Sequence, residues 1–172
     1  ICISYSVSCD NACMKNQAGS AAPVLALEWG IKQSLVRYIA GMADGAIVAS
    51  EPATEAEGGF RFPAAAPPQA DGTLRFAGSV TLTGHGGMLR LVVAEPWLVP
   101  AGKPNDAWSL TIADQYEPGA RIAFATIDRL DLGEAAPSAH GTRLTADGAD
   151  LFFSGPYTEG TELDDPRILG NV

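Results

Sequence analysis

Apolar and polar residues alternate most regularly in the middle of the chain. Between residues 73 and 83 the apolar side chains fall on every second position, which is the period of a half-buried strand. Residues 88–94 continue as a second strand, so the glycine-rich segment 84–87 between them is expected to be the turn of a hairpin. The centre of the chain is therefore predicted to be antiparallel sheet.

One earlier segment has the helical period instead. Five residues stand at i, i+3, i+4, i+7 and i+8 and so share one face: Ile31, Ser34, Leu35, Tyr38 and Ile39. Gly41 and Gly45 follow this segment and are expected to end the helix. The pattern predicts one short helix directly after a short strand.

Further strands are predicted on both sides of these elements. They cover residues 24–29, 46–49, 60–62, 97–100, 107–113, 121–130, 142–145 and 151–154. The acidic stretch between 49 and 60, the polar segment 133–141 and the pair Asp147-Gly148 are expected to be loops or turns. Strands at intervals of about 8–12 residues, with one or two short helices, indicate a mainly β fold, an antiparallel β-sandwich-like domain.

Size and charge narrow the function classes. A chain of 172 residues with 47% hydrophobic residues is one ordinary domain and is too apolar to be a disordered tail. Twenty acidic residues against 11 basic ones give a net charge of -9, so no basic field is available for nucleic acid. No apolar run is long enough to cross a bilayer, and we expect no transmembrane segment in the chain as given.

All three cysteines stand near the beginning of the chain. Cys2, Cys9 and Cys13 fall within residues 1–20, a stretch with no sustained period. We expect these residues to be a flexible leader, a linker or a segment added for expression, and residues 21–172 to be a single domain. A Cys9–Cys13 loop and intermolecular pairing both stay open.

Few residues are available for metal or hydrolytic chemistry. The chain has only two histidines, His85 and His140, so a multi-histidine metal site cannot form within one chain, and three cysteines cannot make an all-cysteine zinc site. The sequence contains no GxSxG, HExxH, P-loop or GxGxxG motif in a suitable context. Acidic pairs such as Asp164-Asp165 lack calcium-loop spacing and are expected at the solvated surface.

Ser34 and Tyr38 lie one turn apart on the predicted helix and project in the same direction. In one interpretation Tyr38 is a core-edge aromatic with its hydroxyl in water, and His85 is an exposed turn residue. In the other, both face a flat ligand, because a glycine-flanked turn allows close approach and a histidine can stabilise a phenolate on a metal. The residues alone leave both interpretations open.

Four blocks of the sequence resemble the HtaA domain, the haem-binding module of actinobacterial haem uptake proteins. They are LEWGIKQSLVRYI (27–39), FRFP (60–63), LRFAGSVTLTGHGGML (74–89) and FFSGPYTEGTELD (152–164). The blocks occur in the family's order, and the resemblance extends roughly over residues 23–167. It implies that residues 21–172 form a single HtaA-like, β-rich, haem-binding domain.

Position by position, the resemblance implies that Tyr38 is the axial ligand of ferric haem b, Fe(III) protoporphyrin IX. His85 would be hydrogen-bonded to this tyrosine, and Ser34 would donate a hydrogen bond to a haem propionate. Tyr157 matches a C-terminal tyrosine that is also associated with haem, in a secondary role. Leu35 departs from the family pattern, where an aromatic residue is typical, so a stacking contact with the porphyrin is not expected here.

The resemblance also implies a function in haem-iron uptake. Phenolate is a hard anionic ligand that favours Fe(III), which suits transport better than electron transfer. We expect a non-enzymatic module that captures or relays haem at the cell surface or outside the cell, with other haem-uptake proteins or host haem proteins as donors and acceptors. Ile31 and Leu35 are expected to cover the porphyrin, with Ser34, Lys32 or Arg37 near the propionates.

Two alternatives belong to other classes. The first is a β-sandwich adhesion or interaction module that keeps the fold without haem. The second is a peroxidase-like haem enzyme, which is disfavoured because no distal acid–base pair is evident once His85 stands beside the tyrosine.

Overall fold

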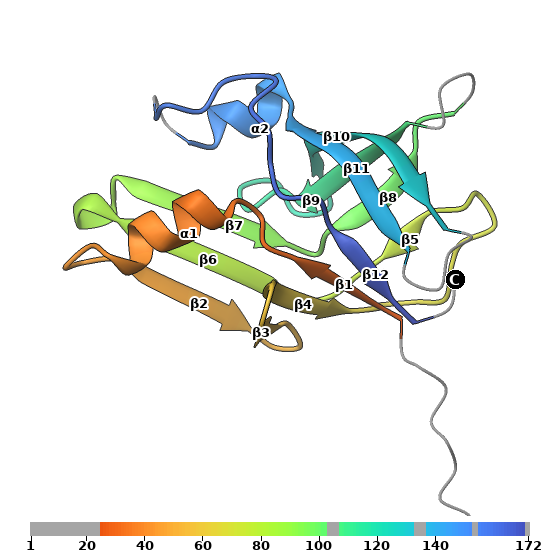
Figure 1. The fold of residues 1–172 in the computed structure, drawn as a ribbon, viewed down its shortest axis with the longest axis horizontal. Helices are drawn as coiled ribbons and strands as arrows, with labels where there is room; N and C mark the ends of the chain where they lie inside the picture. The colour runs from red at the N-terminus through yellow and green to blue at the C-terminus, as the bar shows by residue number, and fades with distance from the viewer. Residues whose placement is uncertain (1–24, 103–106, 133–136, 153–154, 171–172) are drawn as a thin grey trace, which may run out of the picture.

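The computed structural model describes residues 25–102, 107–132, 137–152 and 155–170. Over these residues the protein is built from two antiparallel β-sheets and two short helices (Figure 1). The fold is therefore mainly β and sandwich-like, as the strand spacing predicts. The expectations for Cys2, Cys9, Cys13 and the leader 1–20 lie outside the described residues.

The larger sheet has nine strands. These are β1 (Ala26–Trp29), β3 (Thr54–Ala56), β4 (Gly59–Pro63), β5 (Leu74–Arg75), β8 (Trp97–Pro100), β9 (Trp108–Ala113), β10 (Arg121–Asp131), β11 (Ser138–Leu144) and β12 (Arg167–Leu169). Their order in the sheet is β3-β4-β1-β12-β11-β10-β9-β8-β5. The pairing of β1 with β12 places the first and last strands side by side.

The smaller sheet has three strands, and the turn between two of them carries His85. It consists of β2 (Ala46–Ser50), β6 (Ser79–Gly84) and β7 (Leu89–Ala94), with β6 in the middle. Val80 and Leu82 are fully buried, as the alternation predicts. The helix α1 (Gln33–Ala40) packs against β2 and β6, and Figure 1 shows it at the same end of this sheet as the β6–β7 turn.

The prediction that residues 73–83 form one continuous strand is wrong. It is divided into β5 and β6 at Gly78, whose φ is +96°. A Cβ at Gly78 would lie 2.3 Å from the backbone nitrogen of Ala53, so the close approach of another segment requires glycine here. The break therefore has a tertiary cause that local alternation does not reveal.

Two expected loops are also wrong. In the segment 133–141, the residues from Ser138 onward belong to β11, which is hydrogen-bonded between β10 and β12. The expected turn at Asp147-Gly148 lies inside the helix α2 (Ala146–Asp150), where the Thr145 side chain accepts a hydrogen bond from the Gly148 backbone and caps the helix. Sheet pairing and capping override the turn signals.

Three smaller differences concern short strands. The acidic segment after β2 contains the strand β3, which the sequence pattern does not predict, and the pattern also predicts no strand where β12 lies. Leu151 and Phe152 form a turn rather than a strand, while the rest of the predicted strand, residues 153–154, is outside the described residues.

Asp164 fixes the beginning of α1. Its backbone N–H donates to the Ile31 carbonyl at 3.0 Å, and its own carbonyl accepts from the Trp29 indole at 2.7 Å. Its carboxylate Oδ2 accepts from the Gln33 backbone N–H at 2.9 Å. The residue before the helix, Lys32, supplies no side-chain cap, so Asp164 acts as the capping acceptor from across the chain.

Replacing Asp164 by alanine should lower the free energy of unfolding by about 1 kcal/mol, the usual cost of a lost N-cap. For a domain of this size that corresponds to a fall in Tm of about 2–4 °C, measurable by thermal denaturation. Asp164→Asn keeps one acceptor oxygen and should lose less. An alanine variant as stable as the wild type would contradict the capping role.

Candidate functional site

The structure brings Tyr38 and His85 together. The Tyr38 hydroxyl lies 2.9 Å from His85 Nε2, a hydrogen-bonding distance, and the two ring centroids are 5.8 Å apart. Tyr38 comes from α1 and His85 from the turn between β6 and β7, so the contact joins two separate elements. Tyr38 is 53% exposed, and its phenol oxygen can therefore be approached from solvent.

The local sequence explains how α1 presents Tyr38. Leu35 and Ile39 are buried and anchor the helix against the core. Tyr38 stands beside this buried stripe and lies at the edge of the helix face, half in contact with protein and half in solvent. Ser34, one turn earlier on the same side, is also exposed.

The turn that carries His85 has an unusual backbone. His85, Gly86 and Gly87 form a single 3-10 turn, and all three have positive φ, at 54°, 64° and 90°. A Cβ added at Gly86 or Gly87 would meet nothing within 4 Å, so these glycines serve conformation rather than close packing. His85 itself, a side-chain-bearing residue in the left-handed region, is held there by its surroundings.

Tyr38 and His85 line a pocket with a volume of about 410 Å³. Most of the remaining wall is apolar: Leu35, Met88, Leu89, Phe152 and Pro156. Met88 is 80% exposed, which marks the mouth of the pocket. A flat, largely apolar ligand with one metal or acidic centre matches this lining.

Tyr157 lies in the same pocket. Its ring packs against Phe152 with centroids 4.8 Å apart, and the Lys32 ammonium lies 5.8 Å from its centroid. The pKa of the Tyr157 phenol is raised above its ordinary 10.0, first because burial disfavours the phenolate and second because of the charge of Tyr38. All four residues named from the sequence, Ser34, Tyr38, His85 and Tyr157, therefore line one pocket.

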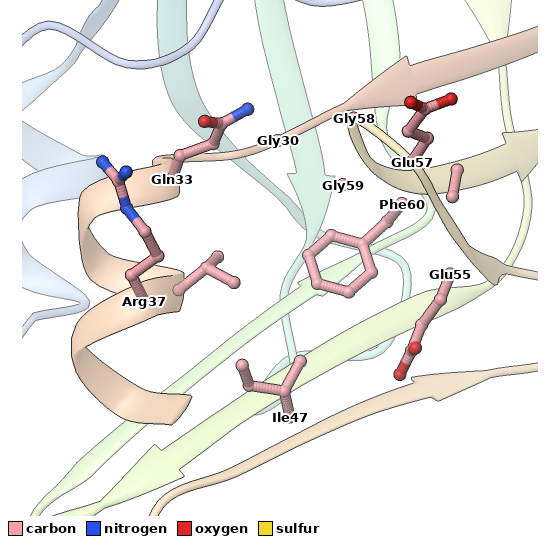
Figure 2. Close-up of a pocket in the computed structure, with 11 residues that line it drawn as sticks. Gly30, Gln33, Arg37, Ile47, Glu55, Glu57, Gly58, Gly59 and Phe60 are labelled. Carbon is pink, nitrogen blue, oxygen red and sulfur yellow. The ribbon is translucent and has the colours of Figure 1, made fainter. Parts of the chain in front are cut away.

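The expectation that Ile31 covers a ligand is wrong. Ile31 is fully buried in the core and does not line the pocket, whereas Leu35 is one of the pocket residues. Of the residues expected near the propionates, Ser34 lines the pocket, and Lys32 donates to the Glu162 carbonyl at 2.8 Å. Arg37 points to a different hollow of about 340 Å³, where Figure 2 shows it with Gln33 on the helix wall and the Phe60 ring opposite.

Sequence reasoning missed five residues of the pocket wall: Met88, Leu89, Phe152, Gly155 and Pro156. All five stand inside the blocks that resemble the HtaA domain, and Met88 directly follows the glycine turn. Their position within these blocks could have indicated that they belong to the pocket. His140 is on β11 and lies 3.3 Å from the carboxylate of Asp131, and it is not among the pocket residues.

The described residues contain no group of three or more His, Cys, Asp or Glu side chains that could hold a bare metal ion. None of the helices in this part of the chain is long and apolar enough to cross a membrane.

Comparison with known proteins identifies the family. Residues 25–168 match the family model HtaA, described as Htaa. The chain belongs to the HtaA family. No curated protein sequence gives a significant match.

Solved structures of HtaA-type proteins share the fold. The C-terminal domain of HtaA from Corynebacterium glutamicum is 23% identical, with a TM-score of 0.66 over 86% of this chain and 97% of that one. The N-terminal domain of the same protein is 25% identical, with a TM-score of 0.66 over 88% and 98% of the two chains. Heme binding protein HtaB from this organism is 19% identical, with a TM-score of 0.65 over 87% and 93%.

The environment of Tyr157 leads to a measurable property of this HtaA-family domain. Because its folded-state pKa is raised, Tyr157 should lose its proton above pH 10.0. In an alkaline titration followed by phenolate absorbance, Tyr157→Phe should remove an absorbance change that occurs above that pH. Tyr116→Phe, at a tyrosine that is 75% exposed, is the matched control. If the absorbance change that Tyr157→Phe removes occurs at or below pH 10.0 in the wild type, the burial of this phenol is contradicted.

Proposed function

We propose that this HtaA-family domain binds ferric haem b through the phenolate of Tyr38, for capture or relay of haem in haem-iron uptake. The observation that carries the proposal is the 2.9 Å contact between Tyr38 and His85 at the mouth of an apolar pocket. Membership of the HtaA family and the fold shared with heme binding protein HtaB support it.

The residues of the pocket fit haem. Met88, Leu89 and Phe152 offer apolar surface to the face of a macrocycle, and the buried Leu35 lies behind it. The phenol oxygen of Tyr38 is a hard ligand once deprotonated and prefers Fe(III) over Fe(II). Haem, when bound, supplies the iron that accepts this oxygen.

His85 positions and tunes the ligand. When Tyr38 is a phenolate, the Nε2–H of His85 can donate to its oxygen and fix its orientation. The hydrogen bond also spreads the phenolate charge and reduces donation to the iron. Movement of His85 would therefore change how firmly haem is held, and a relay between proteins needs such a point of control.

Ser34 and Tyr157 have supporting roles in the proposal. Ser34 is exposed at the pocket rim, one turn from Tyr38, where its hydroxyl can donate to a propionate. Tyr157 remains neutral over the ordinary pH range because its pKa is raised, so it adds aromatic surface and a hydroxyl without charge. Arg37 is left out because it lines the other hollow (Figure 2).

The proposed role is transport rather than catalysis, at the cell surface or outside the cell. Among the described residues that line the pocket, the titratable side chains are Tyr38, His85 and Tyr157. With Tyr38 as the ligand and His85 as its partner, no acid–base pair stands apart from the ligand to activate a second molecule. Other haem-uptake proteins or host haem proteins are the proposed donors and acceptors.

Tyr38→Phe removes the phenol oxygen and leaves the ring. The wild type should bind hemin with a Soret band and a high-spin ferric charge-transfer band typical of tyrosinate. In the variant the charge-transfer band should be absent, and affinity should fall by more than about 100-fold, beyond the usual cost of losing an outer partner of a ligand. Absorption titration with hemin measures both.

Two controls accompany this experiment. Tyr116→Phe removes an exposed phenol outside the pocket, and Arg37→Ala alters the residue next to Tyr38 that faces the other hollow. Neither should change the spectrum. Unchanged binding by Tyr38→Phe would remove the axial assignment, and nonspecific broadening alone with the wild type would favour the adhesion-module alternative.

His85→Ala should retain hemin binding with a shifted charge-transfer band. We expect affinity to fall by roughly 10–100-fold, the typical cost of removing a partner that orients a metal ligand. The reduction potential of the bound iron should also fall, because the phenolate no longer shares its charge with a donor. His140→Ala, which changes the only other histidine, is the matched control. If the two histidine variants give the same spectrum and potential as the wild type, His85 does not act in the pocket.

A further inference from the structure

Asp44 connects the end of α1 to the turn that carries His85. It stands in the segment between the helix end at Gly41 and the start of β2 at Ala46. Its carboxylate Oδ2 accepts a hydrogen bond from the Gly86 backbone N–H at 2.5 Å. The helix of Tyr38 and the turn of His85 are thus joined at a second point, besides the Tyr38–His85 hydrogen bond itself.

The Asp44 carboxylate lies against the backbone of the turn. The Gly86 N–H that it binds belongs to a run of three residues with positive φ, from His85 to Gly87. The pKa of the Asp44 carboxyl lies below its ordinary value, first because of the hydrogen bond from Gly86 and then, among smaller causes, through the His85 backbone and imidazole. Asp44 is therefore a charged acceptor for the backbone of this turn.

A separate contact supports the same connection. A Cβ placed on Gly84, which precedes His85, would lie 2.7 Å from the end of the Met42 side chain. Met42 belongs to the same segment as Asp44, so this segment both packs against the end of the hairpin and hydrogen-bonds to it. Two residues between α1 and β2 therefore contact the part of the hairpin that carries His85.

We propose that Asp44 is a positioning residue that holds the His85 imidazole at the Tyr38 oxygen by binding the Gly86 amide. The consequence for haem rests on the proposed function of Tyr38. His85 occupies a backbone conformation that side-chain-bearing residues rarely adopt, and the Asp44 bond stabilises that conformation. Without the bond the turn relaxes and the imidazole leaves the phenol.

Asp44 is fully exposed, and this makes the proposal testable, because its replacement removes no core contact. Asp44→Ala removes the acceptor, and Asp44→Asn keeps an amide oxygen at the same place. Asp71→Ala is the matched control. Asp71 is also exposed and accepts from a backbone N–H, that of Thr73 at 2.9 Å, but it does not line the pocket.

The first measurement uses the protein without hemin. In Asp44→Ala the heteronuclear NOE of Gly86 and Gly87 should fall, and the imidazole ¹⁵N shifts of His85 should move in the direction seen in Tyr38→Phe. With only two histidines in the chain, this signal is readily assigned. Asp44→Asn should lie closer to the wild type, and Asp71→Ala should match it.

The second measurement uses the hemin-loaded protein. Asp44→Ala should shift the charge-transfer band in the same direction as His85→Ala and lower affinity by up to about tenfold. Combining Asp44→Ala with His85→Ala should add no further shift, because both substitutions interrupt the same contact.

The outcomes separate this proposal from the proposed function. Unchanged NOE values and His85 shifts in Asp44→Ala, or additive effects in the double variant, would overturn the positioning role. If the wild type fails to bind hemin through Tyr38, the proposed function falls, and the measurement without hemin alone decides whether Asp44 holds His85.

Discussion

The contact between Asp164 and the beginning of α1 is the constraint on which the pocket depends. A helix of eight residues is too short to be stable alone, so its position comes from tertiary contacts. Asp164 provides three hydrogen bonds within residues 29–33, and Leu35 and Ile39 then fix the rotation of the helix by burial. The direction in which Tyr38 projects follows from these contacts, because they fix both the beginning of α1 and its rotation about its own axis.

The two members of the polar pair share the smaller sheet as a support. Tyr38 stands on α1, which is tied to Asp164 at its beginning and packs against β2 and β6, whereas His85 stands on the turn of the β6–β7 hairpin of the same sheet. The pair therefore depends on the packing of α1 on this sheet. An exposed phenol whose partner belongs to another element would suit the proposed exchange of haem.

The sequence predicted what local pattern and resemblance determine. The helix ending at Gly41 and the β6–β7 hairpin follow from periods of 3.6 and 2 and from a glycine turn. The break at Gly78 could not be found, because it depends on Ala53 from another segment, and β11 depends on strands on both sides. Resemblance named the four pocket residues, but only packing shows that Ile31 is core and that Arg37 faces another hollow.

Part of the acidic excess of the chain organises backbone. The carboxylates of Asp44, Asp71, Asp114 and Asp164 each accept from a backbone N–H in a turn or at an element end, and that of Asp165 accepts from the Thr142 N–H within β11. With a net charge of -9, the protein offers no long-range attraction to the propionates of haem. In the proposed function, retention would then come from short-range terms, the apolar wall and the phenolate bond to iron. Both terms depend on geometry, which is why the carboxylates that fix α1 and the His85 turn matter more to this site than any cation near it.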